Sequence, residues 1–488
     1  MPAFALPDIE WGLAAPWLGV TLGALVVTLM AVGPRELRRY TGYVALAALI
    51  QPAMTTLNLA WQAERPIDTF GGMLVMDHFA VCFHLIFLLT AFLAILLSLS
   101  GMNDEGREHG EYYALLLYAV SGMMLMAASS HLLVLFLGLE ILSLPLYVMV
   151  GFSKRHERTL EASVKYFLLG AFSTGFTIYG MALMYAATGT LELSEMVVST
   201  ARGGSGAFLL LAGFGLATVG FLFKIAAFPF QYWLPDVYQG APTPVTAFMI
   251  AGTKAAAFAS ILRILTATLF WEGDFTAQWV RLLAVVAALT MTAGNVVALV
   301  QNNIKRMLAY SSIAHAGYLL IAVVSRSEAG LSSIIFYLAA YTFMNVGAFG
   351  VVIALDRARG GSGEGDFIAA FSGLGSRHPW LAAAMTIFML SLTGIPLTGG
   401  FLGKFYIFKA AVDADLYGLA VVGMLNSVVA AAYYLNIVVT MYMKEPVVEP
   451  PAVRTPASLG LGIALSAAGV IWLGLFPTAL LEIAAGLL

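Results

Sequence analysis

The chain has 488 residues, of which 60% are hydrophobic and only 10% are charged, whereas soluble domains carry about a quarter charged residues. A soluble protein of this length would need more polar surface to cover its core, so the composition favours a protein that lies in lipid. The net charge of -3 is too small to indicate nucleic acid or an acidic substrate as a partner.

The sequence contains no motif that would hold a nucleotide, a redox group or a metal ion. Cys82 is the only cysteine, which excludes disulfides within the chain, cysteine-ligated iron–sulfur clusters and covalently attached haem. The run from Gly360 to Gly365 lies among charged loop residues and is typical of a flexible linker rather than a phosphate-binding loop. We therefore expect no cofactor and no metal in this chain.

Charge-free apolar runs of about 20 residues, the length that crosses a bilayer, recur from end to end. The segment Leu13 to Gly33 is the first, and no basic residue precedes Arg35, so it is expected to be a retained span with its N-terminus outside. The sequence predicts an all-α polytopic membrane protein with 14 transmembrane helices. They start near residues 13, 41, 75, 111, 131, 161, 207, 241, 277, 304, 330, 378, 416 and 457.

The placement of Lys and Arg supports this count. With 14 spans and an outside N-terminus, the inside loops hold 14 basic residues, Lys305 and Arg306 among them, and the outside loops hold only Arg65, Arg202 and Arg326. This asymmetry follows the positive-inside rule, and one missed span would reverse it for the rest of the chain. Lys305 and Arg306 are accordingly interpreted as topology anchors at the inner surface.

The seventh, eighth and twelfth spans contain helix-breaking residues beside lysines. Proline and glycine leave backbone groups unpaired, which the bilayer core tolerates only inside protein or beside water. Breaks in corresponding halves are typical of an inverted repeat with its transport site at the broken helices. We expect helices 7 and 12 to be broken and to belong to two inverted five-helix repeats. The predicted regions are 1–110 (three helices), 111–270 (first repeat), 271–445 (second repeat) and 446–488 (a C-terminal helix).

Four ionisable residues lie deep inside predicted spans: Glu140, Lys224, Lys254 and Lys404. Such residues are costly in a membrane and usually serve transport. Glu140 and Lys224 could instead form a static ion pair that fixes helix packing, and a lysine near a helix break could merely bond freed carbonyls. His315 could relay protons because its reference pKa is near neutrality, or it could be satisfied by a serine or a backbone carbonyl.

Lysine and glutamate suit proton transport because burial lowers a lysine pKa and raises a glutamate pKa. Two charges about 4 Å apart interact by about 4 kcal/mol at an effective dielectric near 20, enough to move a pKa by about three. Carrying one charge through about 200 mV costs roughly 4.6 kcal/mol. Because these energies match, a pair that opens and closes could load and eject a proton against a membrane potential.

Two stretches resemble the antiporter-like subunits of respiratory complex I. They are KIAAFPFQYWLPDVYQGAPTPVTAF, from Lys224 to Phe248, and NIKRMLAYSSIAHAGY, from Asn303 to Tyr318. The resemblance extends over essentially the whole chain. Within this family the chain is most similar to the subunit N group, since subunits L and M and the antiporters typically have histidine at the position of Lys254. Subunit M typically has glutamate at the position of Lys404, and subunit L continues into a long lateral helix, whereas this sequence ends at Leu488.

The resemblance implies a role for each residue: Glu140 and Lys224 as the loading pair, Lys254 as the central relay, and Lys404 near the exit. It implies that NADH, FMN, iron–sulfur clusters and quinone would be bound by partner subunits. The partners would be other membrane-arm subunits, including antiporter-like subunit M and the small subunits next to it. The expected location is the bacterial inner membrane, with both termini periplasmic. Two alternatives remain open: a subunit of a multisubunit sodium/proton antiporter, and a purely structural membrane scaffold.

Overall fold

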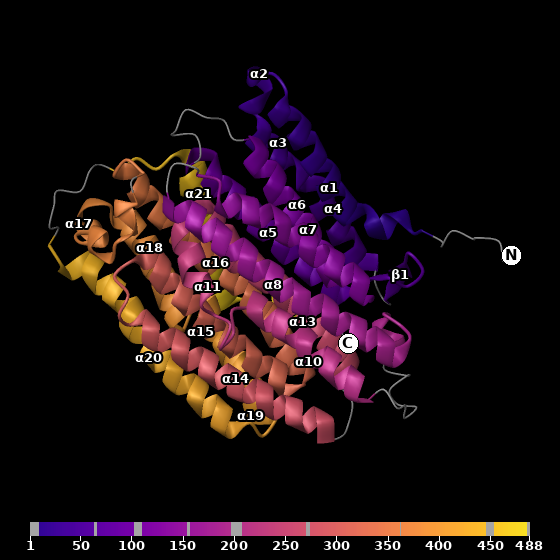
Figure 1. Ribbon diagram of the computed structural model, residues 1–488. Helices are drawn as coiled ribbons and strands as arrows, with labels where there is room; N and C mark the ends of the chain where they lie inside the picture. Colours follow the sequence, from indigo (N-terminus) through magenta and orange to yellow (C-terminus); the bar gives the residue numbers. More distant parts are fainter. Residues whose placement is uncertain are drawn as a thin grey trace.

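The computed structural model describes residues 9–62, 66–101, 110–153, 157–196, 207–269, 274–361, 363–445 and 453–485. Several basic residues that set the predicted orientation, Arg65, Arg107, Lys154, Arg155 and Arg202, lie outside these ranges. Helices run side by side across the molecule, with α1 and α4 at one side and α14 and α20 at the opposite side (Figure 1).

The described chain is almost entirely helical. The first part comprises α1 (Trp11–Val32), α2 (Arg35–Arg38), α3 (Thr41–Ala48), α4 (Ile50–Gln62), α5 (His78–Gly101), α6 (Gly110–Ala128), α7 (Leu132–Val150) and α8 (Glu157–Thr188). The middle comprises α10 (Ala207–Lys224), α11 (Trp233–Gly240), α12 (Thr243–Phe248), the π-helical turn η1 (Met249–Thr253), α13 (Lys254–Leu269), α14 (Asp274–Ala298), α15 (Ile304–Ser325) and α16 (Glu328–Ala358). The last part comprises the 3-10 turns η2 (Glu364–Asp366) and η3 (Ile368–Phe371), then α17 (Leu374–Arg377), α18 (Pro379–Thr393), α19 (Gly399–Asp413), α20 (Tyr417–Met443), α21 (Ala457–Leu475) and α22 (Thr478–Ala485).

A short antiparallel hairpin is the only sheet among the described residues. It joins β1 (Ile67–Thr69) to β2 (Leu74–Met76), with Asp68 opposite Val75. The sequence does not predict this hairpin, because three-residue strands are too short to show an alternating pattern.

Twelve helical segments in the described residues are long and apolar enough to cross a membrane. Two shorter apolar helices, Phe208–Lys224 and Pro379–Thr393, lie where the seventh and twelfth spans are predicted. The polytopic all-α fold is confirmed, whereas the total of 14 spans stays a prediction. The shortness has a physical reason: α10 ends at Lys224, and α18 ends at Thr393 and is capped by Gly394. This glycine has φ +93, a left-handed conformation that favours glycine.

The helices that carry Lys254 and His315 lie at the centre. In α15, α16 and the α12–α13 segment, 94% of an apolar stretch of 18 residues is buried inside the protein. In α1, α8, α14 and α20 the buried share is only 28–33%. Small residues allow close packing, as between α6 and α7. There a Cβ on Gly122 would lie 2.4 Å from the Leu142 nitrogen, and a Cβ on Gly138 would lie 2.9 Å from the Gly122 oxygen. This contact fixes α7, the helix that carries Glu140.

Candidate functional site

Glu140 lies at the edge of the helix bundle. It is half-buried on α7, and Thr174 of α8 donates a hydrogen bond to its Oε1 at 3.0 Å. Its neighbours Leu137 and Ile141 expose 48% and 37% of their surfaces. Glu140 is therefore the member of the predicted set with the readiest route to the outside of this chain.

Lys224 is buried at the last position of α10 and points at α7. Its Nζ donates to Ser143 Oγ at 2.8 Å and lies 5.7 Å from the centre of the Tyr147 ring. Glu140 and Lys224 make no ion pair within 4.0 Å, although the carboxylate acts electrostatically on the ammonium. Ser143 follows Glu140 by one helical turn, so the hydroxyl bonded to Lys224 lies on the same face of α7 as Glu140.

Lys254 begins α13, directly after the π-helical turn η1. It is 2% exposed, and its Nζ donates to the carbonyl and the hydroxyl of Ser312 on α15, the latter at 2.5 Å. Its ammonium also lies 5.6 Å from the centre of the Tyr341 ring. Single π-helical turns inside α-helices occur frequently at functional sites, and here the turn ends at the lysine.

His315 lies on α15, one turn beyond Ser312, and is fully enclosed. Its Nδ1 is hydrogen-bonded to the Tyr337 hydroxyl, and its Nε2 is 3.0 Å from the Tyr434 hydroxyl. The ring interacts electrostatically with both Lys254 and Lys404. The partners are tyrosines rather than the serine or carbonyl considered from the sequence. Because a hydroxyl both donates and accepts, both ring nitrogens have partners suited to proton exchange.

Lys404 lies on α19 and binds the end of the preceding half-helix. Its Nζ donates to the carbonyls of Leu392 and Thr393, at 2.9 and 3.0 Å. These carbonyls form the negative end of the α18 dipole, which favours a cation. A Cβ on Gly394 would lie 3.2 Å from Lys404 Cδ, so glycine serves both the turn and the lysine. Lys404 therefore does bond carbonyls freed at a helix end, the purely structural role that the sequence left open as an alternative to transport.

These five side chains, Glu140, Lys224, Lys254, His315 and Lys404, are called the polar row below. Glu140 acts electrostatically on Lys224, which is bonded to Ser143 on the same helix as Glu140. His315 interacts electrostatically with both Lys254 and Lys404. Among the described residues no direct hydrogen bond joins Lys224 to Lys254. The row thus consists of an edge part and a central part.

The sequence analysis missed the uncharged members of these contacts: Ser143, Thr174, Ser312, Tyr337 and Tyr434. Helical spacing could have identified two of them, because Ser143 follows Glu140 by three residues and Ser312 precedes His315 by three. Tyr337 and Tyr434 are far from His315 in the sequence, and no local pattern indicates them. In the described ranges, no group of three or more His, Cys, Asp or Glu side chains is arranged to hold a metal ion.

Comparison with known proteins gives consistent results. The family model described as "NADH:quinone oxidoreductase/Mrp antiporter, TM" matches residues 129–430. NADH-quinone oxidoreductase subunit N of Trichlorobacter lovleyi is 45% identical over 95% of this chain and 94% of its own length. Subunit N 1 of Solibacter usitatus is 46% identical over the same shares.

Solved structures agree over nearly the full length. A chain of respiratory complex I from Thermus thermophilus is 35% identical with a TM-score of 0.80, covering 96% of this chain and 99% of that chain. A chain of the archaeal membrane-bound sulfane sulfur reductase is 26% identical with a TM-score of 0.87, covering 97% and 96%. A chain of the Mrp complex from Dietzia shares the fold, with a TM-score of 0.85 at 21% identity over 98% and 97%.

Proposed function

Because the chain belongs to the NADH:quinone oxidoreductase/Mrp antiporter transmembrane family, we propose that it is a proton-translocating membrane-arm subunit of an NADH-quinone oxidoreductase, respiratory complex I, corresponding to subunit N. The observation that supports this most is the polar row, four of whose five members, all except Glu140, are buried. Charged groups withdrawn from water inside a membrane mark ion pathways.

In this proposal the edge part loads the proton. Glu140 exchanges a proton with the surroundings at the edge of the bundle, and it acts electrostatically on the Lys224 ammonium, which is held by the Ser143 hydroxyl. A change in the Glu140–Lys224 distance alters how strongly each charge stabilises the other, which changes where the proton rests. In the central part, Lys254, His315 and Lys404 pass the proton toward the exit. The tyrosine hydroxyls on both sides of His315 donate and accept along the way.

The proposed architecture extends the described fold. It has 14 transmembrane helices and two inverted five-helix repeats, residues 111–270 and 271–445, between an N-terminal three-helix segment and a C-terminal helix. The chain lies in the bacterial inner membrane with both termini in the periplasm. Its membrane-arm partners include antiporter-like subunit M and the small subunits next to it, and NADH, FMN, iron–sulfur clusters and quinone are bound by other subunits of the complex. The chain itself performs no redox step.

The proposal is tested in the complete complex in membranes. Lys224→Ala and Glu140→Ala should each reduce coupled NADH:quinone turnover and proton pumping. For the buried lysine we expect a decrease of about a hundredfold, the lower limit of the rate effect that a positioned proton-transfer group usually has. Partner subunits should co-purify in normal amounts. Lys409→Ala serves as the control, since Lys409 is an exposed lysine on α19. Normal pumping in both Lys224→Ala and Glu140→Ala would refute the proposal.

A sodium/proton antiporter subunit is the alternative, because the matching family model includes Mrp antiporters. Lys254 occupies the position where, by resemblance, antiporters carry histidine. Pumping by the complex that is unchanged when sodium is replaced by potassium would favour the complex I assignment. A strict requirement for sodium would favour the antiporter.

A further inference from the structure

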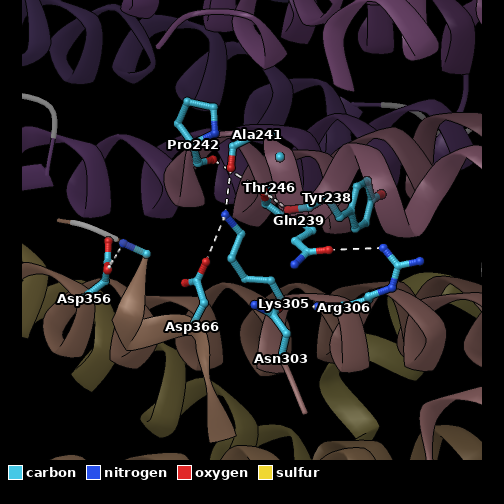
Figure 2. Close-up of polar contacts among 12 residues, drawn as sticks. Tyr238, Gln239, Ala241, Pro242, Thr246, Asn303, Lys305, Arg306, Asp356 and Asp366 are labelled. Carbon is cyan, nitrogen blue, oxygen red and sulfur yellow. Dashed lines mark hydrogen bonds and ion pairs between the residues drawn. The ribbon is translucent and has the colours of Figure 1, made fainter. Parts of the chain in front are cut away.

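A second group of charged residues lies at the predicted inner surface, away from the polar row. Lys305, the second residue of α15, donates from Nζ to the Ala241 carbonyl at 2.7 Å and lies 3.8 Å from Asp366 Oδ2 (Figure 2). Lys305, Asp366 and the Ala241 carbonyl are called the inner clamp below. From the sequence, Lys305 was interpreted as a topology anchor at the inner surface, where its charge would face solvent. In the structure Lys305 is only 4% exposed.

The inner clamp joins the two predicted repeats. Ala241 lies between α11 and α12 in the first, whereas Lys305 and Asp366 belong to the second. Further contacts fix the same junction. Arg306 donates to Gln239 at 3.1 Å (Figure 2) and to Asp236 at 2.7 Å, and both acceptors lie on α11. The Ile368 amide donates to the Asn302 carbonyl at 2.9 Å, which ties the segment after η2 to the start of α15.

Asp366 is an incompletely satisfied buried acid. It is 8% exposed, and its Oδ1 has no hydrogen-bond partner among the described residues. Two charged groups act on it: Lys305 from α15 and Asp356 from α16. Burial raises the pKa of Asp366; the Lys305 ammonium opposes this rise and Asp356 adds to it. Buried polar atoms are rarely left unpaired. Burial of the unpaired Oδ1 is costly because the carboxylate is charged, and a proton on Oδ1 would remove that charge.

We propose that Asp366 is a proton-binding residue on the inner side, and that proton binding there releases the hold of Lys305 on the inner end of α12. The inference rests on the proposed function. When Asp366 is ionised, the two charges of the pair compensate each other, and Lys305 keeps its bond to Ala241. When Asp366 takes a proton from the inner aqueous phase, the pair gains one net positive charge. A lone ammonium is strongly disfavoured in a buried site, so Lys305 moves toward water and leaves the Ala241 carbonyl.

The released element leads directly to the polar row. From Ala241 the chain continues through α12 and η1 to Lys254 without a loop. Movement of the inner end of α12 is thereby transmitted to the lysine bonded to Ser312. Asp366 is in this sense a positioning residue for Lys254 as well as a site where the proton enters.

Inside-out membrane vesicles that contain the complete complex expose this surface to the medium. The measured quantity is the initial rate of NADH-driven proton uptake as a function of medium pH. In the wild type, uptake should fall as rising pH deprotonates Asp366. Lys305→Gln keeps a donor for Ala241 but removes the charge that lowers the Asp366 pKa, so the fall should move to higher pH by about one to three pH units. Asp366→Asn should remove this fall and reduce uptake several-fold throughout.

Two further variants separate the role of the acid from the stability of the fold. Asp366→Glu should restore uptake and its pH dependence, and Glu36→Gln, an exposed acid on α2, should match the wild type. The inference is overturned by a wild-type pH profile in assembled Asp366→Asn, or by an unshifted or downshifted profile in Lys305→Gln. Where Asp366→Asn fails to assemble, Lys305→Gln decides. If Lys224→Ala abolishes pumping while Asp366→Asn behaves as wild type, only the inner clamp is refuted and the proposed function stands.

Discussion

The two parts of the polar row hold their lysines by different chemistry. At the edge, Lys224 donates to a side-chain hydroxyl, that of Ser143, and the nearest acid, Glu140, is half-buried. In the centre, Lys404 donates to the backbone carbonyls of Leu392 and Thr393, and Lys254 donates to the backbone carbonyl of Ser312 as well as to its hydroxyl. A hydroxyl can rotate and can pass a proton, whereas a carbonyl only accepts.

This difference predicts how substitutions act. Removing a central lysine leaves backbone acceptors without a donor inside the bundle, so structure and transport both suffer. Removing an edge partner should affect transport more than stability. The following predictions test this contrast, beginning with the largest expected effect.

Lys404→Ala should reduce coupled turnover about a hundredfold and destabilise the subunit, since each buried group left unpaired costs about 1–3 kcal/mol. Lys404→Arg restores a donor to the two carbonyls but cannot release its proton. The arginine variant should therefore assemble normally and still fail to pump, as measured by subunit co-purification and proton uptake. Wild-type pumping by Lys404→Arg would mean that Lys404 is only a structural cap.

Gly394→Ala should destabilise the junction between α18 and α19 by about 1–2 kcal/mol, because an alanine is strained at a left-handed position. The new Cβ would also press on Lys404 Cδ. Thermal unfolding of the purified complex measures the first effect, and pumping measures the second. Gly418→Ala is the matched control, since Gly418 has no atom within 4 Å of its Cβ position. Equal stability of the two variants would contradict the prediction.

Ser143→Ala should slow pumping and destabilise the subunit less than Lys404→Ala does, since it leaves one buried donor rather than two carbonyls without a partner. It removes the hydroxyl bonded to Lys224, and a hydrogen bond to a charged group contributes about 1.5–3 kcal/mol. A decrease of about tenfold is expected, and Ser143→Thr should restore most of the rate. Ser376→Ala, at an exposed serine, provides the comparison. A stability loss as large as that of Lys404→Ala would remove the distinction between the two parts.

Tyr434→Phe should have the smallest effect, about 0.5 kcal/mol or roughly twofold in rate, because His315 keeps its bond to Tyr337. The double variant Tyr337→Phe/Tyr434→Phe leaves both ring nitrogens without a partner and should lose more than the sum of the single variants. Strictly additive losses in proton uptake would indicate that His315 is not a relay.

Much of the fold could be predicted from the sequence, because each helix that crosses lipid needs about 20 consecutive apolar residues. The helices expected near residues 41, 304 and 457 begin at Thr41, Ile304 and Ala457. The break after residue 393 was predicted from Gly394 and Pro396, because glycine readily adopts non-helical backbone angles and proline lacks the N–H that a helix needs. The deep charged residues were identified because lysine and glutamate stand out in apolar runs.

The partners of these residues could not be predicted, because they depend on how helices pack. Ser312 is 58 residues from Lys254, and Tyr434 is 119 residues from His315. Asp366 was not predicted as a functional residue, because a single acid next to a glycine-rich loop is usually exposed to solvent. Its burial comes from the approach of α15 and α16, which no local pattern records.

The π-helical turn η1 has a consequence for how side chains are assigned to faces along its helix. Such a turn closes on i→i+5 bonds and holds one residue more than an α-helical turn. Residues after it are therefore rotated by roughly 100° relative to an uninterrupted helix. A helical wheel drawn straight through residues 243–269 would aim Lys254 at the wrong neighbour. Because this turn holds the extra residue, deleting one residue between Met249 and Gly252 would restore a continuous α-helix and keep the ammonium directed at Ser312.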